Sequence, residues 1–198
     1  MNFIFRLHHF DQDLSLAINS LHCGVSDVIW QTFSNREIWF VLYAAVLVFL
    51  VLRLGWKRAL LWTVAIVLMI AACDQFSNLI KDTVARWRPC NDQYMLSHGL
   101  RVLEGRGGKY GFFSAHAANA LAFAIGSARA FRSDGSKCRV YTWSIYIWAI
   151  LVGVSRIFVG KHYFGDVITG FLVALAVGFT FSWLVQRISE RVSWFSSR

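Results

Sequence analysis

VITGFLVALAVGFTFSWLVQ, residues 167–186, contains no charged side chain. A helix needs about 20 apolar residues to cross the hydrocarbon core of a bilayer. Further uncharged runs lie at 38–52, 59–73, 110–128 and 140–155. The run at 59–73 is long enough only if it continues past Asp74 to Ile80. Together with a mean hydropathy of +0.48, these segments predict an all-α, integral membrane helical bundle with about five transmembrane helices.

The first 36 residues show a different pattern. MNFIFRLHHFDQD interrupts its apolar residues with Arg6, two histidines and two aspartates, so we expect no cleavable signal peptide. Apolar residues then recur at helical spacing, after Asp11 as a possible N-cap. They are Phe10, Leu14, Ala17, Ile18 and Leu21. We predict N-terminal amphipathic interfacial helices in 1–36 and a transmembrane bundle in 37–198, which together make residues 1–198 one membrane-embedded domain.

The net charge of +9 does not indicate a nucleic-acid partner, because the cations flank apolar runs and form no dense basic block. With five spans, the 20 lysines and arginines divide equally between the two sides of the membrane. The positive-inside count therefore does not indicate which side is cytoplasmic. The side that contains 53–58, 129–139 and 187–198 has only Asp134 and Glu190 as acids. We expect that side to be cytoplasmic.

The cysteines are Cys23, Cys73, Cys90 and Cys138. They show no metal-ligand spacing, and free thiols packed as small core residues are the favoured interpretation. A pairing of Cys23 with Cys90 on the outer side is left open.

Polar clusters interrupt the apolar sequence in three places, all on the predicted outer side. They are KDTVARWRP (81–89), YGFFSAHAAN (110–119) and SRIFVGKHYFGD (155–166). Lys81 and Arg88 lie two turns apart on one helix face, and His162 lies one turn from Asp166. A single cation here could be a snorkelling side chain, and His116 alone a core histidine. Because the clusters share one end of the bundle, a functional site is favoured.

These residue types suit an anionic, tetrahedral ligand. Two arginines and a lysine neutralise phosphate oxygens, and the helix beginning near Tyr163 directs backbone N–H groups to the same place. A neutral histidine is a nucleophile toward phosphorus, an aspartate fixes its tautomer, and a second histidine gives a proton to the leaving oxygen. The pattern predicts metal-free phosphoryl transfer through a phosphohistidine, with no cofactor.

Small residues also recur every four positions on two of the predicted spans. They are Ser114, Ala118, Ala122, Gly126 and Ala130 on one, and Asp166, Gly170, Ala174, Gly178 and Ser182 on the other. Such stripes let helices approach closely in lipid. We expect close packing beneath the polar clusters.

The three clusters resemble the motifs of the type 2 phosphatidic acid phosphatase family, K-x6-R-P, P-S-G-H and S-R-x5-H-x3-D. The first and third are intact, and the second is altered to FSAH at 113–116. The resemblance implies His162 as nucleophile, Asp166 as its partner and His116 as general acid. Phosphate ligands are implied at Lys81, Arg88, Ser114 and Arg156, with the backbone N–H near Ala115. Phe113 and Ala115 replace a proline and a glycine of the family, which affects fine geometry and not the reaction class.

The resemblance implies a multi-pass lipid phosphate phosphatase of the bacterial cytoplasmic (inner) membrane, with its active site facing the periplasm. Undecaprenyl pyrophosphate and lipid A phosphate are the leading candidate substrates. We expect the segment between Arg88 and Ser114 to cover the site and to read the headgroup through Arg101, Arg106 and Lys109. Soluble haloperoxidases of the family hold vanadate in the same pocket, but five apolar spans argue against that branch. Protein partners are not predicted.

Other functions remain open at this point. A lipid phosphotransferase would use the same phosphohistidine and differ only in its acceptor. A non-catalytic membrane anion-binding or transport module would need the arginines and not His162. A haem protein with His116 and His162 as axial ligands is a further alternative.

Overall fold

The computed structural model describes residues 3–191, which are mainly helical and contain no strand, only an isolated bridge between Trp87 and Tyr110. The helices are α1 (Phe3–Asn19), α2 (Gly24–Ser34), α3 (Phe40–Leu54), α4 (Trp56–Val84), the 3-10 helix η1 (Pro89–Asn91), α5 (Gln93–Ser97), α6 (Ala115–Arg132), α7 (Arg139–Phe158) and α8 (Phe164–Arg191).

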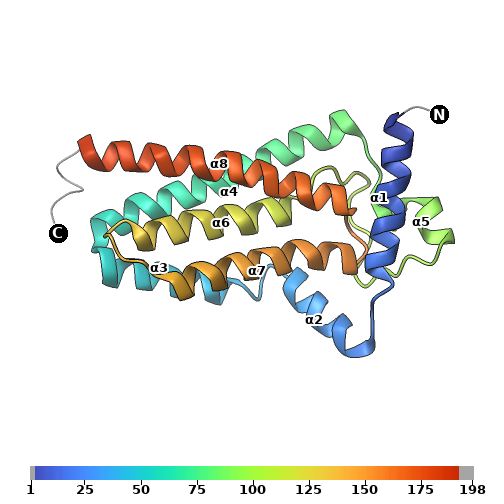
Figure 1. The fold of residues 1–198 in the computed structure, drawn as a ribbon, viewed down its shortest axis with the longest axis horizontal. Helices are drawn as coiled ribbons and strands as arrows, with labels where there is room; N and C mark the ends of the chain where they lie inside the picture. The colour runs from blue at the N-terminus through green and yellow to red at the C-terminus, as the bar shows by residue number, and fades with distance from the viewer. Residues whose placement is uncertain (1–2, 192–198) are drawn as a thin grey trace.

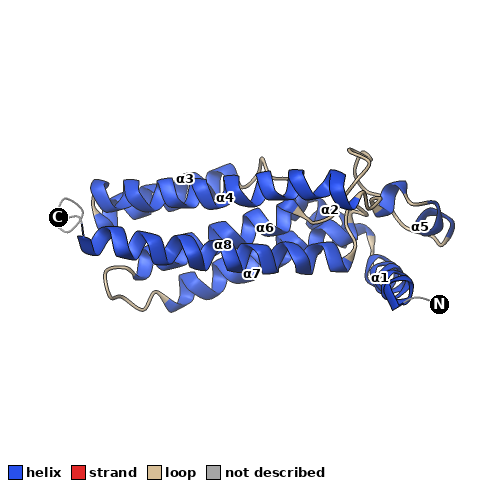
Figure 2. Ribbon diagram, turned by 90° about the horizontal axis from the view of Figure 1, so that it is seen from above, coloured by secondary structure: helices blue, strands red, loops and turns tan. Residues whose placement is uncertain are grey.

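The long helices α3, α4, α6, α7 and α8 run side by side, while α1, α2 and α5 gather at one end of this bundle (Figures 1 and 2). Helix α6 lies at the centre and packs against α4, α7 and α8. Helix α1 crosses the end of the bundle where α7 is connected to α8 (Figure 1). The polar clusters of the sequence all lie at that end.

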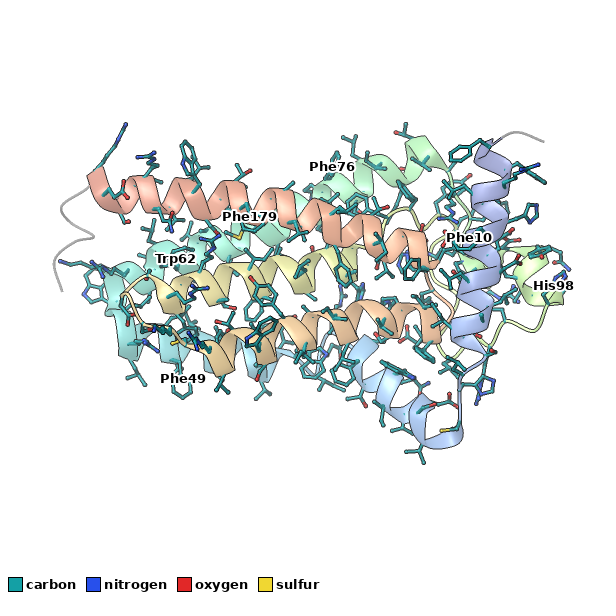
Figure 3. All side chains as sticks on the ribbon, viewed as in Figure 1. Phe10, Phe49, Trp62, Phe76, His98 and Phe179 are labelled. Carbon is teal, nitrogen blue, oxygen red and sulfur yellow. The ribbon has the colours of Figure 1, made fainter. Side chains whose placement is uncertain are left out.

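Each predicted apolar run forms a helix, but the helices differ in length. Within the described residues, α4, α7 and α8 are long and apolar enough to span a bilayer. Helix α3 is apolar but has 15 residues, and α6 has 18 residues that are mostly buried in the bundle. Large apolar side chains such as Phe49 and Phe179 are 63% and 52% exposed, and Phe49 lies at the outer edge of the bundle (Figure 3). Apolar residues on both the inner and outer faces characterise helices surrounded by lipid. The chain is a helical membrane protein.

Small residues produce close helix packing around α6, as the sequence predicted. A Cβ atom added at Gly170 of α8 would lie 2.6 Å from the Ser114 carbonyl oxygen, and one at Gly126 of α6 would lie 2.6 Å from the Ile66 side chain of α4. The α8 stripe therefore faces α6, and it begins at Asp166. Close packing fixes the start of α8 against the start of α6.

The prediction that Asp11 caps its own helix is wrong. Helix α1 begins at Phe3, and Asp11 lies within it. Its carboxylate instead accepts a hydrogen bond from the backbone N–H of Gly165, at the start of α8. An aspartate satisfies a free helix N–H equally well from another helix, because capping requires only an acceptor at the right place.

Helix α1 turns its polar face to the protein and its apolar face outward. Asp11, Ser15 and Asn19 are 9%, 1% and 1% exposed, whereas Phe3 and Phe10 are 78% and 63% exposed. Asn19 donates to the carbonyl oxygens of the last turn of α7. The polar contacts of α1 therefore hold it on the end of the bundle.

Candidate active site

The turn between α7 and α8 places Arg156 next to His162. Gly160 adopts φ +76°, and the backbone N–H groups of Lys161 and His162 both donate to the Arg156 carbonyl oxygen, at 3.0 and 3.1 Å. A Cβ at Gly160 would lie 2.8 Å from the Arg101 carbonyl oxygen, so only glycine fits this turn.

His162 and Asp166 form a buried pair. His162 Nδ1 lies 3.5 Å from Asp166 Oδ2, and the side chains are 3% and 0% exposed. The same Oδ2 accepts a hydrogen bond from the Tyr163 backbone N–H at 3.1 Å. At 3.5 Å from Asp166 Oδ2, His162 Nδ1 has no hydrogen-bond partner among the described residues, and catalytic hydrogen bonds often tighten only when a substrate is bound. Because Nδ1 faces the carboxylate, Nε2 is the nitrogen available for chemistry.

Burial, followed by the charges of Arg156, Arg88 and Lys81, lowers the pKa of His162 well below its ordinary value of 6.5. The neutral imidazole, which is the nucleophilic form, therefore predominates at neutral pH. The same charges show that the cations of the first and third motifs lie around this histidine.

We therefore expect His162 to remain neutral at pH 6, where an unperturbed histidine is mostly protonated. The measurement is a pH titration of ¹⁵N-histidine-labelled protein by NMR, with His162→Ala used to assign the resonance. A titration midpoint at or above pH 6.5 for this residue would contradict the description of the site.

The predicted phosphate ligands are each oriented by a contact within the protein. Arg88 Nε donates to the Tyr110 carbonyl oxygen at 3.0 Å. This contact uses Nε and not the two terminal nitrogens of Arg88. Lys81 Nζ lies 3.4 Å from Asn78 Oδ1. Arg156 is 4% exposed and contacts Ser34 and, at 3.5 Å, Glu104 Oε2. Its Nε has no hydrogen-bond partner among the described residues.

The altered second motif, FSAH, forms the N-terminus of α6. Ser114 is the N-cap, and its Oγ accepts from the Ala117 N–H at 3.4 Å. Ala115 is the first helical residue and is not among the described residues with positive φ, so an alanine is compatible with this position. Phe113 is 1% exposed and packs on Phe76, so that its buried ring anchors the entry to the helix.

Not every predicted headgroup residue faces the histidines. Arg101 pairs with Asp27 of α2 at 2.5 Å, and the ammonium of Lys109 lies over the Trp87 ring, 4.5 Å from its centroid. Arg106 is exposed. The cysteines are all free thiols, and Cys90 donates to the Arg106 carbonyl oxygen, so Cys23 and Cys90 are not paired.

Two adjoining cavities open beside His116. The deeper one has a volume of about 410 Å³ and lies between α3, α4, α6 and α7. Most of its lining is apolar, from Phe33, Phe40, Tyr43, Ile70, Ala120 and Val152, and Asp74 and Asn119 also line it. The outer one, about 390 Å³, has a polar lining of Gln31, Ser34, Asn35, Arg36, Glu37, Glu104, His116 and Arg156. The geometry suits a ligand with a polar head and an apolar tail.

The sequence analysis missed several residues of this site. Arg36 and Glu104 line the polar cavity, and Arg86 forms an ion pair with Asp166 at 2.8 Å. Arg86 lies inside the first motif, and Arg36 lies next to the first predicted span. Both are cations at the predicted outer edge of the membrane, and this position could have identified them as candidates. No signal in the sequence distinguished Glu104.

Comparison with known proteins identifies the family. The model of the PAP2 superfamily matches residues 62–190. The chain is 32% identical to the lipid A 4'-phosphatase of Bacteroides thetaiotaomicron, over 94% of this chain and 81% of the relative. It is 34% identical to the lipid A 4'-phosphatase of Porphyromonas gingivalis, over 85% of this chain and 70% of the relative.

A solved structure agrees with the fold. The crystal structure of a transmembrane PAP2-type phosphatidylglycerolphosphate phosphatase from Bacillus subtilis superposes with a TM-score of 0.73 and 18% identity, covering 94% of this chain and 90% of that one. With the first and third motifs intact and the family model matched across the site, the chain belongs to the PAP2 superfamily.

Proposed function

We propose that this protein hydrolyses a phosphate group from a membrane lipid through a phosphohistidine at His162. The observation that carries the proposal is the buried His162–Asp166 pair at 3.5 Å, with three cations around an imidazole whose pKa is lowered. Membership of the PAP2 superfamily and two relatives named as lipid phosphatases support the same reaction.

The proposed reaction has two steps. Neutral His162 attacks phosphorus through Nε2, the bond from phosphorus to the lipid oxygen breaks, and His116, which enters this step as an imidazolium, gives its proton to that oxygen. His116 then takes a proton from water, whose oxygen attacks the phosphohistidine and releases inorganic phosphate and neutral His162. Lys81, Arg88 and Arg156 stabilise the charge on the phosphoryl oxygens in both steps, together with the Ser114 hydroxyl and the backbone N–H near Ala115.

For the substrate we propose lipid A, with the 4'-phosphate as the group removed. The two relatives with this printed activity align over most of the chain. The polar cavity next to His116 contains amide, carboxylate and guanidinium side chains, which suit the hydroxyl and amide groups of a phosphorylated sugar. The apolar cavity would receive part of an acyl chain. Undecaprenyl pyrophosphate is the alternative that an assay must compare.

We place the protein in the bacterial inner membrane with the site facing the periplasm. The exposed apolar face of α1, with Phe3, Leu7 and Phe10 at 78%, 56% and 63% exposure, supports a position in the membrane interface. The site would then lie at the level of the lipid headgroups, where a lipid phosphate is found.

The assay that tests the proposal is phosphate release by purified protein in detergent with excess EDTA. The substrates are lipid A, undecaprenyl pyrophosphate, phosphatidylglycerophosphate and phosphatidic acid, each with wild type and His162→Ala. We expect release that survives EDTA, is fastest with lipid A and is lost in the variant. Equal release by the variant, or transfer of the phosphate to an added lipid alcohol in place of water, would overturn the hydrolase proposal.

Filling the apolar cavity should weaken lipid binding selectively. Ala120 is 3% exposed and lines this cavity one turn after His116. We expect Ala120→Phe to raise KM for lipid A about tenfold, a loss of about 1.4 kcal/mol of binding, because the ring occupies the space of the acyl chain. The rate with p-nitrophenyl phosphate, which has no acyl chain, should change by less than about twofold.

The matched control for this substitution is Leu172→Phe on the outer surface of α8, where Leu172 is 61% exposed. It adds an aromatic ring outside the cavity and should leave both substrates unaffected. An equal loss with lipid A and p-nitrophenyl phosphate in Ala120→Phe would contradict the assignment of the cavity.

A further inference from the structure

Arg86 connects the N-terminal helix to the catalytic pair. Its Nη1 donates to Asp166 Oδ1 at 2.8 Å and its Nη2 to Asp11 Oδ2 at 2.6 Å. The Asp11, Arg86 and Asp166 side chains are 12%, 16% and 0% exposed. The guanidinium also lies over the Tyr163 ring, 4.0 Å from its centroid. Contacts on three sides therefore fix the position of this cation.

Asp11 has a second role, at the start of α8. Its Oδ1 accepts from the Gly165 N–H at 2.8 Å, and Ser15 Oγ accepts from the Phe164 N–H at 2.9 Å. The first N–H groups of a helix have no partner within it, and here α1 supplies both acceptors. A Cβ at Gly165 would lie 2.7 Å from Asp11 Oδ2, so the glycine permits this close approach.

Arg86, together with the Tyr163 backbone N–H that donates to Oδ2 at 3.1 Å, fixes which oxygen of Asp166 faces the nucleophile. With Oδ1 bound to Arg86, Oδ2 is the oxygen directed at His162 Nδ1. A carboxylate at 0% exposure is costly to keep ionised without an opposite charge. A protonated Asp166 would stabilise a phosphohistidine cation less well than an ionised one.

We propose that Arg86, held by Asp11 of α1, is a positioning residue that orients the Asp166 carboxylate and keeps it charged, so that α1 forms part of the support of the active site. This inference rests on the function proposed above. Arg86 acts through Asp166, and its two terminal nitrogens are occupied by carboxylates, so it does not bind the phosphate.

Arg86→Ala is the first variant that tests the inference. We expect kcat for phosphate release to fall about 100-fold, with KM within about threefold of wild type, because the phosphate ligands are intact. Guanidinium chloride at low millimolar concentration should restore part of kcat by occupying the space left by the side chain. A residue that only stabilises the fold would show no such rescue.

Two further variants complete the experiment. Arg53→Ala removes another arginine–aspartate bridge, Arg53 to Asp134 at 2.9 Å, outside the active site, and should keep wild-type kinetics with no response to guanidinium. Asp11→Asn keeps an oxygen acceptor for Gly165 and removes the charge that holds Arg86. We expect it to lower kcat about tenfold without altering elution on size-exclusion chromatography.

The outcomes separate the inference from the function on which it rests. Wild type and His162→Ala, assayed in parallel, report on the proposed hydrolysis, whereas the ratio of each variant to wild type reports on positioning. A wild-type kcat in Arg86→Ala, or a loss confined to KM, would overturn the inference. So would an inactive Arg86→Ala that guanidinium does not restore, combined with a wild-type kcat in Asp11→Asn.

Discussion

Replacing His162 with alanine is expected to lower kcat for phosphate release by at least about 10³-fold. The substitution removes the nucleophile, and no other imidazole takes its place, because His116 lies on α6 on the leaving-group side of the proposed reaction. The cations remain, so substrate binding should be largely preserved. The measurement is release of inorganic phosphate from lipid A under single-turnover conditions.

The matched control is His98→Ala. His98 is an exposed histidine after α5, stacked on Tyr94 with ring centroids 4.0 Å apart, at the end of the molecule beyond α1 (Figure 3). It should keep wild-type activity. Residual activity in His162→Ala above about a tenth of wild type would exclude a histidine nucleophile at this position.

Arg156→Ala is expected to lower kcat/KM by about 10²–10³-fold. Arg156 is buried beside His162, where an arginine opposite the phosphoryl oxygens acts in a medium of low dielectric constant. In the wild type, Arg156 Nη1 lies 3.5 Å from Glu104 Oε2. The substitution therefore also removes the cation that pairs with Glu104. Kinetics with lipid A measure the loss.

Arg156→Lys separates the charge from the geometry of the guanidinium. Lysine keeps the charge and loses the planar fork that binds two oxygens, so we expect an intermediate loss. Arg129→Ala, which removes an arginine from the last turn of α6 that lies over the Phe179 ring, should have no effect. A kcat/KM for Arg156→Ala within about threefold of wild type would contradict the assignment of Arg156 as a phosphate ligand.

Local patterns in the sequence predicted most of the helices and the site motifs. The prediction that Lys81 and Arg88 share one helix face is wrong, because α4 ends at Val84 and Arg88 is extended. The run at 167–186 lies within α8, and its small residues face α6, because a helical repeat determines which side chains share a face. His162 and Asp166 meet because they are four residues apart across the start of α8, which begins at Phe164. The charges of Lys81, Arg88 and Arg156 all act on His162, as the clustering of polar residues at one end of the bundle predicted.

Contacts between distant segments were not predictable in the same way. Asp11 accepts a hydrogen bond from Gly165, 154 positions further along the chain at the start of α8, and the sequence indicates only that an acceptor is present. The polar cavity combines Arg36 and Glu104 with His116, and no periodicity relates these segments. Helix α6 also begins later than the apolar run at 110–128, because Ser114 is its N-cap and residues 110–114 lie outside the helix.

The most direct test of the account is to trap the covalent intermediate. Lipid A labelled with ³²P at the 4'-position is mixed with the protein, quenched in alkali within the first turnover, and the digested peptides are identified by mass spectrometry. The account predicts an alkali-stable, acid-labile phosphate on His162 that is absent from His162→Ala and decays in step with the release of inorganic phosphate. Phosphate on another residue, or full turnover with no label on His162 at any time point, would contradict it.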